Sequence, residues 1–130
     1  MVTEEFIRTE FAPWEEGNPM PWFEKLDDSI SWHICGTLNP TAGTYHSKAE
    51  VIECFGKLMS KVTGPPECKV TNVITSGDTA VVTMDFHAVA HNGWDYKQEC
   101  CMIGKYEAGV CVSVNLFIDT AGEIKLFSEN

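Results

Sequence analysis

The sequence predicts an α+β protein in which a curved, antiparallel or mixed sheet wraps as a cone around N-terminal helices. Two observations lead to this prediction. Apolar residues recur mostly at helical spacing before Gly64-Pro65-Pro66, and after it they alternate or form short runs between hairpin signals. The chain has 130 residues, 44% of them hydrophobic, so we expect one domain over residues 1–130 with one core.

Two short helices are expected to open the chain. Thr3 can cap a helix over residues 3–11, whose apolar residues recur at helical spacing. Gly17-Asn18-Pro19 ends it, and residues 20–26 can restart as a short helix with proline in the first turn. A helical hairpin therefore precedes the sheet.

The first strand is expected over residues 29–35, which are rich in β-branched and aromatic side chains, and Gly36 ends it. Along this strand Trp32 and Ile34 face one way and His33 faces the other.

A loop over residues 37–46 leads to a third helix, which Ser47 can cap. Its apolar stripe consists of Val51, Ile52, Phe55, Leu58, Met59 and Val62. The remaining chain reads as a meander of four strands: 69–75, 79–90, 95–106 and 110–118. Asn92-Gly93 is the strongest hairpin signal, because both central residues of a type I′ turn need positive φ.

The net charge and the cysteines of the chain limit which partners and metal sites are expected. Nine Lys and Arg against 19 Asp and Glu give a formal charge of −10, which disfavours nucleic acid and anionic membranes. We find no signal-peptide pattern and no apolar stretch of membrane-spanning length, so we expect a soluble, cytoplasmic protein. The six cysteines then read as free thiols, and none is spaced as Cys-x-x-Cys, so no metal site is expected.

Several segments resemble a known family. Trp32 to Thr37 and Pro40 to Lys48 resemble the W-x-V-x-G-T-x-P-L-A-G-x-Y-x-S-K run of SnoaL-like proteins, part of the NTF2-like superfamily that includes ketosteroid isomerase. The resemblance continues through 72–74, 77–82, Asn92-Gly93 and Phe117-Ile118-Asp119. It implies a cone with an interior cavity and a homodimer formed through the outer sheet face. The sequence contains no glycine-rich phosphate loop, Ser-His-Asp order or dinucleotide fingerprint, so no cofactor is indicated. Because this fold hosts many reactions, the reaction must come from the site.

His33 is the first candidate for acid/base catalysis. It occupies the offset from Gly36 at which ketosteroid isomerase carries its proton-abstracting aspartate, and a histidine can serve as base or acid near neutral pH. The alternative is a core histidine satisfied by a backbone carbonyl. By the same comparison Met102 stands where that enzyme keeps an acid that donates a hydrogen bond, which methionine cannot do.

Four further candidates share the concave face if the last hairpin alternates regularly through Gly109: Cys100, Met102, Asn115 and Phe117. Relatives carry larger polar side chains at several of these places, so this chain's residues should widen the pocket for a bulky, apolar ligand. Asn115 could orient a ligand oxygen or tie down a loop. Cys100 reads as a packing residue rather than a nucleophile.

The remaining candidates have competing readings. Asp85 and His87 lie on one face of their strand and could form an acid/base pair, although the apolar opposite face favours an outward position. Tyr45 and Trp22 could contact a ligand or simply pack against the rest of the protein. Asp119 could cap the final turn or close the pocket rim.

These features predict a cofactor-independent isomerase or cyclase that acts by acid/base catalysis on a bulky, mostly apolar polyketide, meroterpenoid or alkaloid intermediate. His33 would move a proton, and Asn115 would hold a polar atom of the substrate. The alternatives are an epoxide hydrolase, a dehydratase, or a non-catalytic binding or dimerisation module.

Overall fold

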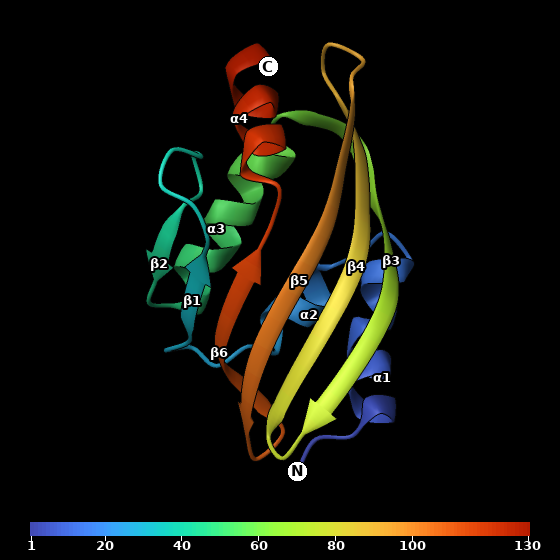
Figure 1. Cartoon of the computed structure of the whole chain (residues 1–130), viewed down its shortest axis with the longest axis vertical. Helices are drawn as coiled ribbons and strands as arrows, with labels where there is room; N and C mark the ends of the chain where they lie inside the picture. The colour runs from blue at the N-terminus through green and yellow to red at the C-terminus, as the bar shows by residue number, and fades with distance from the viewer.

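The structure, a computed structural model, describes residues 1–130 and contains four helices and six strands (Figure 1). The helices are α1 (Glu4–Glu15), α2 (Met20–Glu24), α3 (Lys48–Met59) and α4 (Thr120–Glu129). The strands are β1 (Ser31–Ile34), β2 (Gly43–Tyr45), β3 (Val62–Ser76), β4 (Thr79–Ala90), β5 (Asp95–Glu107) and β6 (Val110–Phe117). The α+β prediction is therefore confirmed. None of the helices has the length and apolar character of a membrane span.

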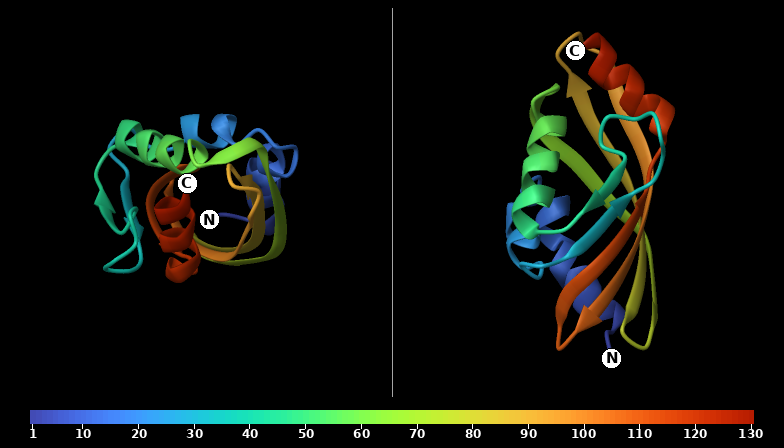
Figure 2. Two further views of the ribbon diagram at one scale, coloured as in Figure 1. Left: turned by 90° about the horizontal axis from the view of Figure 1, so that it is seen from above. Right: turned by 90° about the vertical axis from the view of Figure 1, so that its left-hand side faces the viewer.

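All six strands form one mixed sheet in the order β2-β1-β6-β5-β4-β3. Only β1 and β6 pair in parallel, whereas the other neighbours are antiparallel. Seen from above, the sheet curls around an interior that α3 and the N-terminal helices cover on the other side (Figure 2). The inner face of the sheet and these helices share one cluster of buried apolar residues.

Two helix starts form as the sequence predicts. The Thr3 side chain accepts a hydrogen bond from Phe6 N at 3.1 Å and caps α1. Ser47 Oγ accepts from Glu50 N at 3.1 Å, while the Glu50 carboxylate accepts from His46 N at 2.9 Å. The first of these bonds satisfies a free N–H group at the start of α3, and the second ties the residue before the cap to the first turn.

Three elements differ from the sequence prediction. The short strand β2 lies inside the expected loop 37–46, where it pairs with β1. Strand β3 starts at Val62 rather than at residue 69, because Val62 and Thr63 already pair with β4. The pairing is then interrupted between Thr63 and Glu67, and prolines are tolerated at such an interruption. The final segment forms α4, with the Asp119 side chain accepting from Ala121 N and Gly122 N.

Helix α4 lies beside the β4–β5 hairpin, at the end of the cone where the chain ends (Figure 1). Lys125 Nζ lies 5.0 Å from the centroid of the Trp94 ring, and Asn92 N donates to Asn130 Oδ1 at 2.9 Å. These contacts hold α4 in the position from which one of its side chains reaches the interior.

Candidate active site

The interior of the cone contains a cavity of about 90 Å³, lined by 18 residues of which 15 are hydrophobic. One water molecule needs about 10–15 Å³ of cavity volume, so several waters or a small organic molecule would fit. The lining residues are Trp14, Phe23, Trp32, Ile34, Thr41, Val51, Cys54, Phe55, Leu58, Met84, Phe86, Tyr96, Gln98, Cys100, Met102, Leu116, Ile118 and Glu123.

Aromatic rings from the helices take up much of the cavity wall. Phe23 and Phe55 stack with centroids 4.8 Å apart, and Trp14 contacts both of them at 5.4 and 5.6 Å. On the sheet side, Phe86 meets Tyr96 at 6.2 Å. The cavity wall is therefore largely aromatic and apolar.

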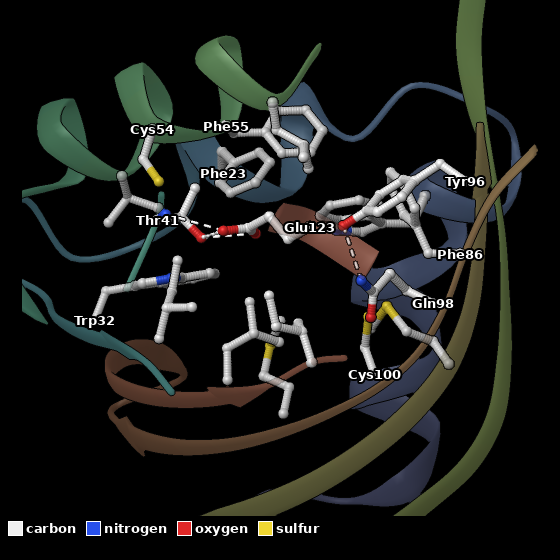
Figure 3. Close-up of a pocket in the computed structure, with 18 residues that line it drawn as sticks. Phe23, Trp32, Thr41, Cys54, Phe55, Phe86, Tyr96, Gln98, Cys100 and Glu123 are labelled. Carbon is white, nitrogen blue, oxygen red and sulfur yellow. Dashed lines mark hydrogen bonds between the residues drawn. The ribbon is translucent and has the colours of Figure 1, made fainter. Parts of the chain in front are cut away.

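One carboxyl group enters this apolar cavity. Glu123 projects from the start of α4, is only 2% exposed, and lies next to Thr41 in the cavity lining (Figure 3). Its Oε1 accepts from Thr41 N at 2.9 Å and, at 3.4 Å, from Asn39 Nδ2. The Thr41 hydroxyl lies 2.6 and 2.7 Å from the two carboxyl oxygens. A buried carboxyl group requires such donors, because leaving it without partners would be costly.

The loop between β1 and β2 is shaped to deliver those donors. Gly36 has φ of +108°, a value that favours glycine, and a Cβ there would overlap Asn39 Oδ1. Asn39 also donates to Cys35 O at 3.1 Å, and the Tyr45 hydroxyl donates to Thr41 O at 2.9 Å. Backbone and side-chain bonds thus hold Thr41 against Glu123.

Tyr96 and Gln98 supply polar groups from β5. Gln98 Nε2 donates to Tyr96 Oη at 3.0 Å and to Asp119 O at 2.8 Å, while Gln98 Oε1 accepts from Asp119 N at 2.7 Å. Gln98 therefore joins β5 to the start of α4. Burial raises the pKa of Tyr96 well above its usual value, and the charge of Glu123 raises it further. Tyr96 consequently stays protonated and can donate a hydrogen bond.

Two sequence-predicted site residues line the cavity, and a third supports its wall. Cys100 and Met102 face the interior as expected. Burial raises the pKa of the Cys100 thiol to about 12, so it is a poor nucleophile at neutral pH. Tyr45 lies behind Thr41 rather than in the cavity lining, and burial raises the pKa of its hydroxyl.

Asn115 and Phe117 do not face the cavity, so their expected position on the concave face is wrong. The β5–β6 pairing shifts by one residue between Lys105 and Tyr106, and Met102 therefore pairs with Leu116 instead of Asn115. A one-residue shift turns every following side chain to the opposite face. Leu116 and Ile118 line the cavity in their place, and Phe117 is 46% exposed outside.

His33 also lies on the outer face, where it is exposed and Nδ1 lies 2.8 Å from Thr44 Oγ1. The predicted alternation along β1 is correct, but the interior takes Trp32 and Ile34. Because the cavity is apolar, the two apolar residues turn inward and the histidine faces outward. His33 is thus neither a base inside the cavity nor a core histidine.

Asp85, His87 and Trp22 are also outside the cavity. Asp85 is exposed on the outer face, as the apolar opposite side of β4 indicated, and His87 forms ion pairs there with Glu67 and Asp95. Trp22 is 3% exposed but packs in the core outside the cavity lining, for example against Trp32 at 5.8 Å. No three His, Cys, Asp or Glu side chains come together as a metal site.

The polar groups of the cavity were missed by sequence reasoning. Tyr96 and Gln98 share the alternation of Cys100 and Met102 along β5, and this alternation alone could have found them. Glu123 could have been found from Asp119, whose N-cap position defines a helix that carries Glu123 inward. Thr41 lies in a loop without a periodic pattern.

Comparisons with known proteins address the fold. No protein-family model matches the sequence, and no curated protein matches it. Among solved structures, the chain is similar to a protein of unknown function with a cystatin-like fold from Xanthomonas campestris, with a TM-score of 0.80 and 25% identity over 97% of this chain and 98% of that chain.

Two other solved structures are similar at lower identity. An NTF2-like protein of unknown function from Burkholderia pseudomallei gives a TM-score of 0.78 at 20% identity, covering 94% of both chains. TerC, co-crystallised with polyporic acid, gives 0.78 at 15% identity over 95% of this chain and 96% of that chain. The chain therefore has the NTF2-like fold, also called ketosteroid isomerase-like. This fold includes isomerases and binding modules.

Proposed function

We propose that the chain is a cofactor-independent isomerase or cyclase that moves a proton within a small, mostly apolar organic molecule. The observation that carries the proposal is Glu123, a carboxyl group only 2% exposed on the wall of an otherwise apolar cavity. A carboxyl group placed against an apolar ligand is suited to general acid/base catalysis.

Glu123 has capacity for this role. Oε1 accepts from Thr41 N and Asn39 Nδ2, whereas the only protein donor near Oε2 is the Thr41 hydroxyl, which it shares with Oε1. Oε2 therefore keeps a free lone pair for a substrate proton. Fixing the carboxylate on one side aligns it before the substrate binds, which lowers the cost of reaching the transition state.

The size of the cavity favours a ligand of about one ring over a bulkier intermediate. Its volume is about 90 Å³, and Phe23, Phe55 and Phe86 bound it. A cyclic ketone is a fitting substrate class, because base removal of an α-proton gives an enolate whose oxygen a protonated Tyr96 can stabilise.

Isomerisation of cyclohex-3-enone tests the proposal. Glu123 would remove a proton from the α-carbon and return it to the γ-carbon while the double bond moves into conjugation with the carbonyl. No atom is gained or lost, and the conjugated product is followed by its ultraviolet absorbance. We expect the protein to accelerate this reaction and Glu123→Gln to slow it by about 10²–10⁴-fold.

Two variants serve as controls for general effects of mutation. Asp85→Asn removes an exposed carboxylate from the outer face, and His33→Ala removes an exposed imidazole. Both should retain the wild-type rate. Loss of activity in His33→Ala with full activity in Glu123→Gln would reject Glu123 as the base. Binding of cyclohex-3-enone without turnover would support the rival class, a non-catalytic binding module.

We also propose that two copies associate through the outer face of the sheet. Phe117 is 46% exposed there and pairs with Cys101 of β5. Ile74, 64% exposed, lies on the same face of the sheet, and exposed apolar side chains that share one face favour a protein contact. Sedimentation velocity should give twice the chain mass of 14.5 kDa, and Phe117→Asp should give a monomer. A wild-type protein that sediments at 14.5 kDa would contradict this.

A further inference from the structure

Trp14 has a feature that neither its packing nor the proposed proton transfer explains. The side chain is 5% exposed and packs among aromatic rings, including Phe23 at 5.4 Å and Phe86 at 6.5 Å. Its indole Nε1–H is fully buried and has no hydrogen-bond acceptor in the protein. Buried donors without a partner are rare in folded proteins, and each calls for a specific reason.

The position of Trp14 supplies that reason. Trp14 lines the same cavity as Glu123, and its aromatic neighbours offer no oxygen or nitrogen acceptor. Tyr96, also on the cavity wall, accepts from Gln98 Nε2, and the structure gives its own proton no acceptor. The cavity thus contains two donors that lack partners, while its carboxyl group is already bonded to protein donors on one side.

We infer that the Trp14 indole N–H binds an oxygen acceptor of the ligand, so that the cavity selects small cyclic ketones or their enolates over pure hydrocarbons of the same shape. This inference rests on the proposal that the cavity takes a small organic molecule. An indole N–H can only donate, so it forms a hydrogen bond with a carbonyl oxygen and forms none with an ammonium group or a C–H group. Tyr96 is the second donor available to the same ligand.

A pair of ligands with matched shape isolates this hydrogen bond. Cyclohexanone carries a carbonyl where methylenecyclohexane carries a C=CH₂ group. Their affinities differ in any protein because water solvates the ketone better, so the informative quantity is how the affinity ratio changes on mutation. We expect Trp14→Phe to lower the preference for cyclohexanone by about tenfold, the effect of one buried hydrogen bond.

Trp22→Phe is the matched control. It makes the same substitution in the same aromatic cluster, since Trp14 and Trp22 lie 5.9 Å apart, but Trp22 does not line the cavity. The ratio should stay at its wild-type value in this variant. An unchanged ratio in Trp14→Phe, or an equal fall in Trp22→Phe, would overturn the inference.

A second measurement needs no mutation at Trp14, in case that variant does not fold. The indole N–H proton resonance of Trp14 should move downfield when cyclohexanone binds and much less when methylenecyclohexane binds. Replacing each of the other three tryptophans in turn assigns this resonance. Equal shifts with both ligands would show that the indole does not bond to the carbonyl.

The outcomes separate this inference from the proposed function. If Trp14→Phe loses the ketone preference while cyclohex-3-enone is not isomerised, the binding role stands and the catalytic proposal fails. If Glu123-dependent isomerisation occurs with no role for Trp14 in ketone preference, the catalytic proposal stands and this inference fails. If neither cyclohexanone nor methylenecyclohexane binds and cyclohex-3-enone is not isomerised, both are overturned.

Discussion

Glu123 and Thr41, 82 positions apart in the chain, meet inside the cone, where the Glu123 carboxyl group accepts from both the backbone N–H and the hydroxyl of Thr41. This contact joins α4 to the loop between β1 and β2 at the cavity lining (Figure 3). It has two consequences: it fixes the only carboxyl group of the cavity, and it makes the stability of the fold depend on that group's partners.

Thr41→Val should destabilise the protein by about 1–3 kcal/mol, because it leaves a buried carboxyl group without its hydroxyl donor. The matched change Thr44→Val removes a hydroxyl bonded to exposed His33 and should cost less than about 0.5 kcal/mol. Urea denaturation of both variants measures the difference. Equal losses would mean that the Thr41–Glu123 contact adds no stability.

Gly36→Ala should cost about 3 kcal/mol or more. The φ of +108° strains any other residue, and the added Cβ would also overlap Asn39 Oδ1 and come within 2.9 Å of Thr120 Cγ2. Gly56→Ala in α3 is the control, since nothing lies near its Cβ position, and there alanine should stabilise by about 0.5–1 kcal/mol. A mild effect at Gly36 would contradict the described loop.

His87 should stabilise the fold more at low pH than at high pH. Hydrogen bonds to Asp95 and Glu67 raise the pKa of His87 in the folded protein. The stabilisation is fully present below the unfolded-state pKa of about 6.5 and is lost as pH rises through the higher folded-state value. The stability gap between wild type and His87→Gln should therefore be larger at pH 6 than at pH 9. A gap that grows with pH would disprove the ion pairs.

Cys100 should resist alkylation in the folded protein. Burial raises its pKa to about 12, so on the order of one thiol in 10⁴ is ionised at pH 8. Cys101 faces the outer surface, where it lines an open depression, and should react first with iodoacetamide. Mass spectrometry of the digested protein identifies the modified residue, and both should react in urea. Rapid native labelling of Cys100 would mean that the cavity is open.

The sequence allowed most of the fold to be predicted, because the elements carry local signals. Strand β4 follows from alternation over 79–90, and α3 from an apolar stripe behind Ser47. Helix α4 was missed because Gly122 and few periodic apolar residues weaken its pattern. Strand β2 was missed because three residues carry no detectable alternation.

The site was predicted poorly because it depends on register and on contacts between distant segments. Asn115 would have faced the cavity in a regular hairpin, but one shifted pair beside Tyr106 placed Leu116 there instead. No local pattern indicates such a shift. The Glu123–Thr41 contact likewise exists only after α4 and the β1–β2 loop have come together.

Hydrogen–deuterium exchange tests most directly whether Glu123 moves a proton in the cavity. Cyclohexanone incubated in D₂O with the protein should lose its α-proton NMR signals faster than without it, and Glu123→Gln should abolish this acceleration. Because exchange needs only removal and return of a proton, it does not require the natural substrate. If the Glu123→Gln protein exchanges the α-protons of cyclohexanone as fast as the wild type does, Glu123 is not the base and the account is contradicted.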